Sequence, residues 1–370
     1  MGTVRALLAI SVVFFHAYGF ALVGGVLAVQ LFFIISGFLI SYVLVEARTY
    51  GSLQSFYENR ALRLFPIYFA VAFAALALHL FLYAVMGLPS PVVETYQNLN
   101  DEGRLALTLS NLGVFGQDWI MFTALDQGNF GFTTDYTDTQ VVVWQGLLVP
   151  QAWSLGIELS FYLIAPFVLP RMRLMLYLLA ASLGLRAYLM VTGLGFTDPW
   201  SYRFFPTELA MFLFGALSHQ LWMPFVKAKG WLTNRAAIWV TLGILAYCAA
   251  YAFFPGRAVQ HVALMAVFTL ALPFLFRVQG LFRIDRRIGD LSYPIYICHM
   301  LILLPVSMAY DHLKGVTDYR GIDETLMVIS LTLIASVWLN RHVGDRIEAL
   351  RDRIRAGALD KPSLGATTPT

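Results

Sequence analysis

The chain has 370 residues, of which 59% are hydrophobic and only 13% are charged, and its formal net charge is +3. A mean hydropathy of +0.68 excludes a soluble globular domain, and so small a net charge gives no sign of nucleic-acid binding. Cys248 and Cys298 both lie within apolar stretches, so we expect neither a disulfide nor a cysteine metal site.

Apolar runs of roughly 18 or more residues predict helices that span a membrane. The runs, separated by charges and turn residues, cover residues 4–21, 25–46, 62–87, 152–170, 173–192, 204–222, 235–254, 258–276, 289–309 and 324–341. The first run has no clear cleavage site after it, so we expect it to be retained. We therefore expect an all-α, multi-pass membrane protein with about ten transmembrane helices.

The first expected span carries two ionisable residues, Arg5 and His16. Eleven steps of about 100° come within roughly 20° of three full turns, so both side chains share one helix face. They lie about 16 Å apart along the axis, roughly half the thickness of a bilayer core. Because ionisable groups inside a span usually mark a site, we interpret them as two ends of a reaction path across the membrane.

Arg60 and Arg63 lie three residues apart, where the third expected span leaves the cytoplasm. They are about 60° apart on one helix face, and Arg5 enters the membrane at the same level. Three guanidiniums gathered there would bind a phosphate or pyrophosphate, because their planar forks match oxyanions. An ordinary positive anchor at the cytoplasmic surface is the alternative interpretation.

The longest connection, residues 88–151, is acidic and aromatic. Sixty residues without structure would be unusual, so we expect a folded outer segment here. Residues 105–122 are half apolar, which indicates an interfacial or re-entrant helix.

Further along the chain, Glu158 in the fourth span and Glu208 in the sixth lie at a depth similar to that of His16, with Arg203 just above Glu208. We expect one outward-facing polar cluster, in which a carboxylate bonded to the His16 ring raises its basicity. A purely structural pair of His16 and Glu158 is the alternative.

His299, in the ninth span, has Tyr293 and Tyr296 as natural hydrogen-bond partners, so a structural and a functional role are equally open. We interpret His79 and His261 as incidental.

An even number of spans places both termini on one side of the membrane. With cytoplasmic termini, most of the 25 Lys and Arg residues fall on the inner side, as the positive-inside rule requires. We therefore expect a transmembrane domain over 1–345 and a cytoplasmic tail over 346–370, whose first part is a charged helix on the inner surface.

Together these segments resemble acyltransferase family 3, the integral-membrane carbohydrate O-acyltransferases, over most of the chain. The resemblance is carried by the stretches RALLAISVVFFHA, GGVLAVQLFFIISGFLIS, FYENRALRLFPIYF, WSLGIELSFYLIAP, RFFPTELAMFLFGA and LSYPIYICHMLIL, in this order.

The resemblance implies an O-acyltransferase of the bacterial inner membrane. An acyl group, commonly acetyl, would pass from cytoplasmic acyl-CoA to a hydroxyl of a carbohydrate or glycolipid outside the membrane, without a metal. His16 and Glu158 would be catalytic, and Arg5, Arg60 and Arg63 would hold the donor. We expect Arg203, Glu208 and His299 to contact the acceptor, whose identity, like the acyl chain length, stays open.

The chemistry agrees with this role for His16. Transfer from a thioester to an alcohol needs the hydroxyl deprotonated as it attacks, and a positioned histidine contributes roughly 10²- to 10⁴-fold by doing so. Direct transfer and an acyl-enzyme are both open. Ser36, the ninth-span tyrosines and a helix end are alternative donors to the oxyanion.

The chain departs from the family pattern at both ends. Relatives usually have a Leu-Asp-Gly-Leu-like lead before the first arginine, whereas Met1 to Val4 precede Arg5 here. Many relatives also carry a soluble hydrolase-like domain after the last helix, which we do not expect in the residues after the last span. We expect envelope glycan-assembly partners to handle the acceptor. A proton-coupled transporter or exporter of a small solute is the main rival hypothesis, and a flippase or scaffold is the other.

Overall fold

A computed structural model of the chain describes residues 1–19, 22–137 and 139–359. Each expected span falls on a helix: α1 (Gly2–Tyr18), α2 (Gly25–Ser41), α3 (Leu53–Ala84), α7 (Trp153–Val168), α8 (Met172–Val191), α9 (Phe205–Leu217), α11 (Asn234–Ala250), α12 (Arg257–Leu281), α14 (Ser292–Lys314) and α15 (Ile322–Leu339). The other helices are α4 (Pro91–Asn98), α5 (Asp101–Gly113), α6 (Gln117–Ile120), α10 (Met223–Ala228), α13 (Arg283–Asp290) and α16 (Asp345–Leu359).

The all-α, multi-pass membrane class is confirmed. Within the described residues, 8 helical stretches are long and apolar enough to cross a membrane. Helix α1 is apolar but has only 17 residues, and α7 has 16. The expected ten crossings and the cytoplasmic termini therefore stay predictions.

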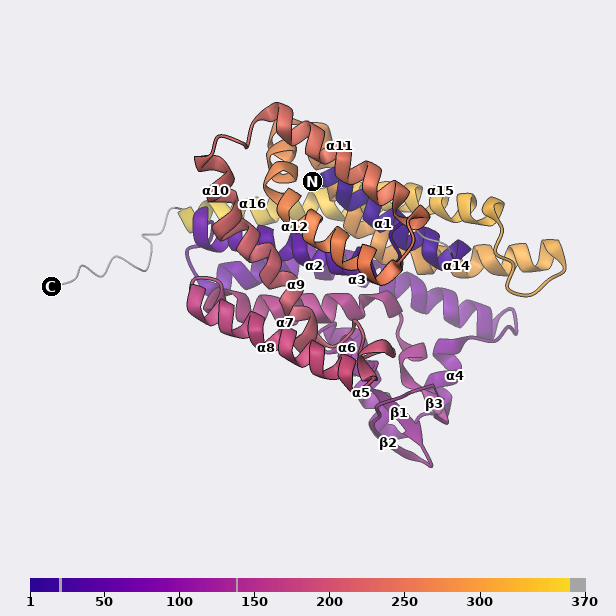
Figure 1. The fold of residues 1–370 in the computed structure, drawn as a ribbon. Helices are drawn as coiled ribbons and strands as arrows, with labels where there is room; N and C mark the ends of the chain where they lie inside the picture. Colours follow the sequence, from indigo (N-terminus) through magenta and orange to yellow (C-terminus); the bar gives the residue numbers. More distant parts are fainter. Residues whose placement is uncertain (20–21, 138, 360–370) are drawn as a thin grey trace.

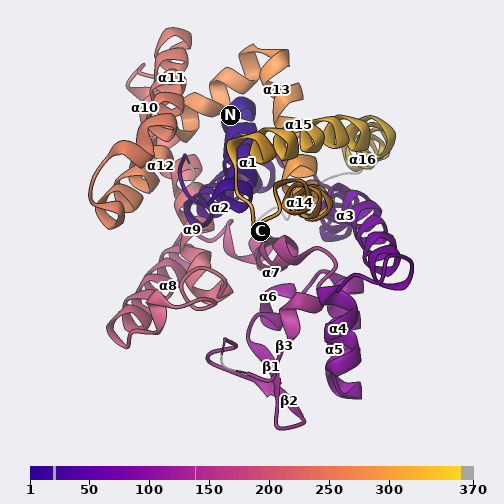
Figure 2. The same cartoon turned by 90° about the vertical axis from the view of Figure 1, so that its right-hand side faces the viewer.

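The long helices run roughly along one direction, with the small sheet near one end and the C-terminal helix α16 near the other (Figure 1). Viewed along the bundle, α1, α2 and α14 lie in the middle, and the remaining long helices surround them (Figure 2). Helix α2 is accordingly buried over most of its length, and Leu8 of α1 and Phe38 of α2 are fully buried. Residues on these two helices can therefore line internal cavities.

Several helix boundaries differ from expectation, and two of them bear on the position of the site residues. Helix α3 begins at Leu53, well before residue 62, because Ser52 and Ser55 form a reciprocal capping box at its polar start. Helix α1 ends at Tyr18, and Gly19 follows in the left-handed region with φ of 76°. His16 consequently lies in the last turn of α1. Residues 20 and 21, at the end of the expected span, are outside the described residues.

Residues 88–151 are folded, as predicted. They contain α4, α5, α6 and an antiparallel sheet of order β2-β1-β3, formed by β1 (Thr123–Asp126), β2 (Asn129–Phe132) and β3 (Val141–Val142). Gln127 and Gly128 connect β1 to β2 with φ of 47° and 80°, the geometry of a tight hairpin turn. The expected half-apolar helix over 105–122 is split between α5 and α6.

The tail begins with α16, which packs on α3: Arg351 Nη2 donates to Asn59 Oδ1 at 3.2 Å. The same oxygen accepts from Arg60 Nη2 at 3.0 Å. Helix α16 is thus hydrogen-bonded to Asn59, the residue that precedes Arg60. The rest of the expected 346–370 tail, residues 360–370, lies outside the described residues.

Candidate active site

The start of α1 is fixed by an acidic side chain from α13. Asp285 Oδ2 accepts from the Gly2 amide at 2.8 Å, and Oδ1 accepts from the amide and hydroxyl of Thr3 at 2.8 and 2.6 Å. The carboxylate thereby satisfies amides that a helix start leaves unpaired. This contact sets the height and rotation of α1, and with them the position of Arg5.

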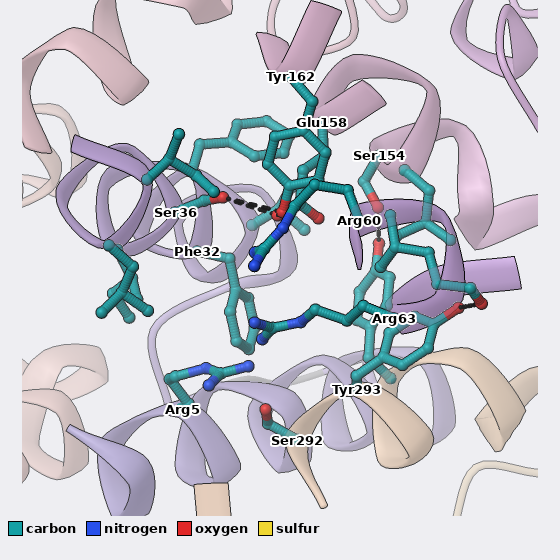
Figure 3. A pocket seen from close by; sticks show the side chains of 18 residues that line it. Arg5, Phe32, Ser36, Arg60, Arg63, Ser154, Glu158, Tyr162, Ser292 and Tyr293 are labelled. Carbon is teal, nitrogen blue, oxygen red and sulfur yellow. Dashed lines mark hydrogen bonds between the residues drawn. The ribbon is translucent and has the colours of Figure 1, made fainter. Parts of the chain in front are cut away.

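Arg5, Arg60 and Arg63 line one pocket, as predicted. Figure 3 shows their guanidiniums pointing into the same space from α1 and α3. We call it the arginine pocket; it has a volume of about 80 Å³, and its other lining residues include Val29, Phe32, Ser36, Ser154, Glu158, Tyr162, Ser292, Tyr293 and Tyr296.

The guanidiniums differ in how they are held. Arg60 is buried, and its Nη2 donates to Tyr50 at 2.6 Å as well as to Asn59. Within the described part of the chain, the side chains of Arg5 and Arg63 form no hydrogen bond and no ion pair. Three like charges that converge with two of them unpartnered favour an anionic ligand, because that ligand would relieve their repulsion.

Glu158 is the carboxylate of this pocket, which corrects its expected contact with His16. Its Oε1 accepts a hydrogen bond from Ser36 at 2.7 Å and another from Tyr162 (Figure 3). Equal depth on two helices does not fix their rotation. On α7 the face that carries Glu158 and Tyr162, four residues apart, turns toward α2 and the arginines.

His16 lies in a second cavity, of about 250 Å³, which we call the histidine cavity. Its wall comes from α1, α2, α14 and the segments before α7 and α9: Val12, Phe15, His16, Gly25, Val26, Val29, Met121, Trp144, Pro150, Gln151, Trp153, Tyr202, Arg203, Tyr296 and Met300. The His16 side chain is exposed to this space. It is therefore accessible to a ligand.

His299 is fully buried next to His16, with their ring centroids 5.3 Å apart. Its Nδ1 donates to the Tyr296 carbonyl at 2.7 Å, because a carbonyl can only accept. Its Nε2 has no partner in the described residues. The expected hydrogen bond to a tyrosine is thus made to the main-chain carbonyl of Tyr296 and not to a phenol. The buried ring of His299 lies against the ring of His16.

Arg203 lines the histidine cavity, and its charge is matched by Asp198, with Nε 2.6 Å from Oδ1. Its guanidinium stacks on Trp153 at 4.6 Å and on Tyr202 at 4.7 Å. Burial raises the pKa of Tyr202 to about 12, so its phenol stays protonated. Arg203 therefore orders an aromatic wall of this cavity.

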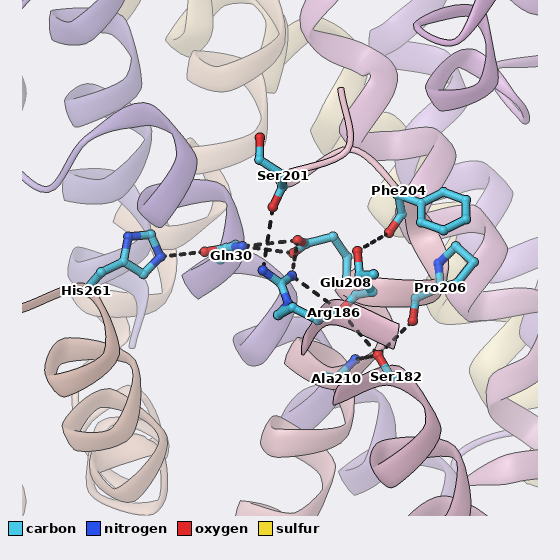
Figure 4. Close-up of polar contacts among 10 residues, drawn as sticks. Gln30, Ser182, Arg186, Ser201, Phe204, Pro206, Glu208, Ala210 and His261 are labelled. Atoms are coloured by element: carbon cyan, nitrogen blue, oxygen red, sulfur yellow. Dashed lines mark hydrogen bonds and ion pairs between the residues drawn. The ribbon is translucent and has the colours of Figure 1, made fainter. Parts of the chain in front are cut away.

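Glu208 does not join His16, which corrects the expected four-residue cluster. It pairs with Arg186 of α8, and both its oxygens accept from Gln30 Nε2, at 3.1 and 3.2 Å (Figure 4). Gln30 Oε1 in turn bonds His261 Nε2 at 2.7 Å, so His261 is not incidental. An arginine inside an apolar span needs an acidic partner, so Arg186 was the sequence signal that could have predicted the partner of Glu208.

The two cavities meet at a thin wall. Val29 and Tyr296 line both the arginine pocket and the histidine cavity, and they are 5% and 7% exposed. The Tyr296 hydroxyl is fixed by Ser154 Oγ at 2.8 Å and donates to the Gln151 carbonyl at 3.0 Å. The two cavities are thus adjacent, and these two side chains contribute to the wall between them.

Sequence reasoning missed Tyr162 as the second partner of Glu158, as well as Trp144 and Gln151 in the histidine cavity. The spacing of four from Glu158 was the available signal for Tyr162. Nothing local marks Trp144 or Gln151, because the folding of 88–151 brings them to His16. In the described residues no three His, Cys, Asp or Glu side chains gather as metal ligands.

Comparison with known proteins gives one match. A family model described as an acyltransferase domain matches residues 2–341. No curated protein and no solved structure matches the chain.

Proposed function

Because this chain belongs to the acyltransferase domain family and is a multi-pass membrane acyltransferase for hydroxyl acceptors, we propose that it moves an acyl group from acyl-CoA to a carbohydrate outside the membrane. Acetyl is the proposed acyl group, and a bacterial inner membrane is the proposed location. The meeting of an arginine pocket with a histidine cavity at Val29 and Tyr296 carries the proposal.

The arginine pocket suits the donor. Arg5 and Arg63 have unused guanidinium donors, which a CoA diphosphate would accept from. The nucleotide would stay at the entrance while the pantetheine arm enters between the apolar side chains of the pocket. Glu158 would act here, by fixing the Ser36 and Tyr162 hydroxyls beside that arm.

The histidine cavity suits the acceptor. The acceptor oxygen bonds the thioester carbonyl carbon, and its proton passes to His16. The C–S bond breaks, and the leaving thiolate takes up a proton, so the products are an O-acyl ester and the free thiol. His299 would keep the His16 ring in place, 5.3 Å from its own ring centroid. Arg203 would shape the acceptor wall and Glu208 would support it through Arg186.

The test is His16→Ala in vesicles that contain the full chain. With acetyl-CoA on one side and a surface glycan preparation on the other, the wild type should yield acetylated glycan. The variant should lose roughly 10²- to 10⁴-fold in kcat, because its general base is gone.

A matched control is His312→Ala, since His312 is an exposed histidine in the last turn of α14. It should leave the rate unchanged. Normal transfer by His16→Ala would show that another group is the base, and absence of any glycan acylation by the wild type would overturn the proposed function.

A further inference from the structure

The C-terminal helix α16 reaches the arginine pocket through one shared hydrogen-bond acceptor. Asn59 Oδ1 accepts from Arg60 Nη2 at 3.0 Å and from Arg351 Nη2 of α16 at 3.2 Å. It also accepts from the Tyr50 hydroxyl at 3.0 Å. Asn59 is fully buried, and Arg60 and Arg351 are 6% and 8% exposed, so this oxygen is shielded from water.

The three side chains that donate to this oxygen compete with one another. An amide oxygen has two lone pairs, and two guanidiniums that share it also repel each other. When Arg60 moves away from the oxygen, Arg351 can therefore bond it more strongly. Arg60 lines the arginine pocket, so an anion that draws its guanidinium into the pocket should tighten the contact between Asn59 and α16.

A charge of α16 also lies near the other two arginines of the pocket. Asp290 at the end of α13 interacts electrostatically with both Arg5 and Arg63. The same carboxylate interacts with Glu348 of α16, which pairs with Arg351 one turn further along the helix. Helix α16 is thus adjacent to neighbours of all three arginines.

We propose that Arg351 is a positioning residue for the arginine pocket, and that anion binding in the pocket and docking of α16 strengthen each other. With Arg351 on the Asn59 oxygen, the Arg60 guanidinium is more readily given up to a ligand. Linkage requires the reverse effect to be equally large. The inference rests on the proposed function only for the identity of the anion as the diphosphate of an acyl donor.

The first experiment measures amide hydrogen exchange of the full chain in lipid nanodiscs, with inorganic pyrophosphate and with coenzyme A as separate probes. Calorimetry establishes the saturating concentration of each probe. Amides of residues 345–359 should exchange about 5-fold more slowly, or slower still, when a probe is bound. The measurement uses the wild type, so a misfolded variant cannot imitate the result, and unchanged exchange with bound pyrophosphate would overturn the proposal.

The second experiment compares variants of α16 by calorimetry with pyrophosphate. Arg351→Ala should bind it about 5- to 10-fold more weakly than the wild type, because Arg60 then stays on the Asn59 oxygen. Arg351→Lys keeps one donor for that oxygen and should recover part of the affinity. Arg353→Ala is the matched control, since Arg353 is an exposed arginine of the same helix, and it should bind as the wild type does.

A double-mutant cycle separates positioning from a merely structural role. In an Arg60→Gln background, Arg351→Ala should cause no further loss of pyrophosphate affinity, because it acts through Arg60. An equal loss in both backgrounds, equal affinity of Arg351→Ala and Arg353→Ala, or a wild type that binds neither probe would overturn the proposal. Coupling to pyrophosphate without binding of coenzyme A would instead count against the proposed function and leave the coupling standing.

Discussion

Single residues in the two cavities differ in what they contribute to the fold. Arg60 is buried and bonded to Tyr50 and Asn59, so it connects α3 to the segment before the helix as well as facing the arginine pocket. Arg5 and Arg63 point into the pocket without a described partner. Residues that are left unpaired at a cost to stability are the ones that a ligand should need.

We therefore expect Arg63→Gln to raise the KM for acyl-CoA by about 10- to 100-fold. This factor corresponds to the free energy that a hydrogen bond to a charged group contributes. The same change should raise the melting temperature of the protein without ligand, because it removes one of three mutually repelling charges. Steady-state kinetics and thermal unfolding in detergent measure both effects.

Arg173→Gln is the control, since Arg173 is an exposed arginine at the start of α8. An unchanged donor KM in Arg63→Gln would exclude Arg63 from the donor site.

Among the elements, α2 and α9 pack closely against each other at two glycines. A Cβ at Gly37 would lie 1.9 Å from the Phe212 carbonyl oxygen, and one at Gly215 would lie 1.9 Å from that of Ile34. The closeness lets Phe33 stack on Phe212 at 4.7 Å. Because α2 also carries Val29 and Ser36, this crossing fixes one wall of both cavities.

Gly37→Ala and Gly215→Ala should each destabilise the protein by roughly 1–3 kcal/mol or more, since the obstacle is backbone and cannot rotate away. Gly184→Ala and Gly243→Ala are matched helical controls, with nothing within 4 Å of the added Cβ. Thermal unfolding of the four variants checks this. If the Gly37 and Gly215 variants melted at the same temperature as the two controls, α2 and α9 would not pack as closely as described.

The folded 88–151 segment packs against the helix bundle, and a buried aspartate lies at this contact. Asp118 of α6 is 2% exposed, and its carboxyl group packs against Gly156 of α7. A Cβ added to Gly156 would lie only 2.6 Å from Asp118 Oδ1. Burial raises the pKa of Asp118 to about 7, with two backbone amides opposing the shift. The folded protein thus holds a proton there that the unfolded chain loses near pH 4.

Stability should therefore fall as the pH rises from about 4 to about 7 and then level off, by up to about 4 kcal/mol from this group. Asp118→Asn cannot titrate and should flatten that slope. Thermal unfolding in detergent from pH 5 to pH 8 compares it with the wild type. Asp126→Asn, at an exposed aspartate of the same segment, should keep the slope; an unaltered slope in Asp118→Asn would assign the titration elsewhere.

Much of this architecture could be predicted from the sequence, because partition into a bilayer depends on composition and the position of a charge along a helix depends on counting. The convergence of Arg5 with Arg60 and Arg63 followed in this way. The hydrogen-bond partners of Glu158 and Glu208 could not be predicted from the sequence. They depend on the rotation of each helix about its axis, which is set by packing contacts such as those of Gly37 and Gly215. Long-range folding of 88–151, which brings Trp144 to His16, leaves no local signal.

The wall of Val29 and Tyr296 has a consequence for the cell. Two cavities joined into one water-filled route would let protons run down the membrane gradient. A buried valine and a tyrosine hydroxyl held by Ser154 close that route between them. Under the proposed function, the thioester would have to pass these two side chains to reach His16.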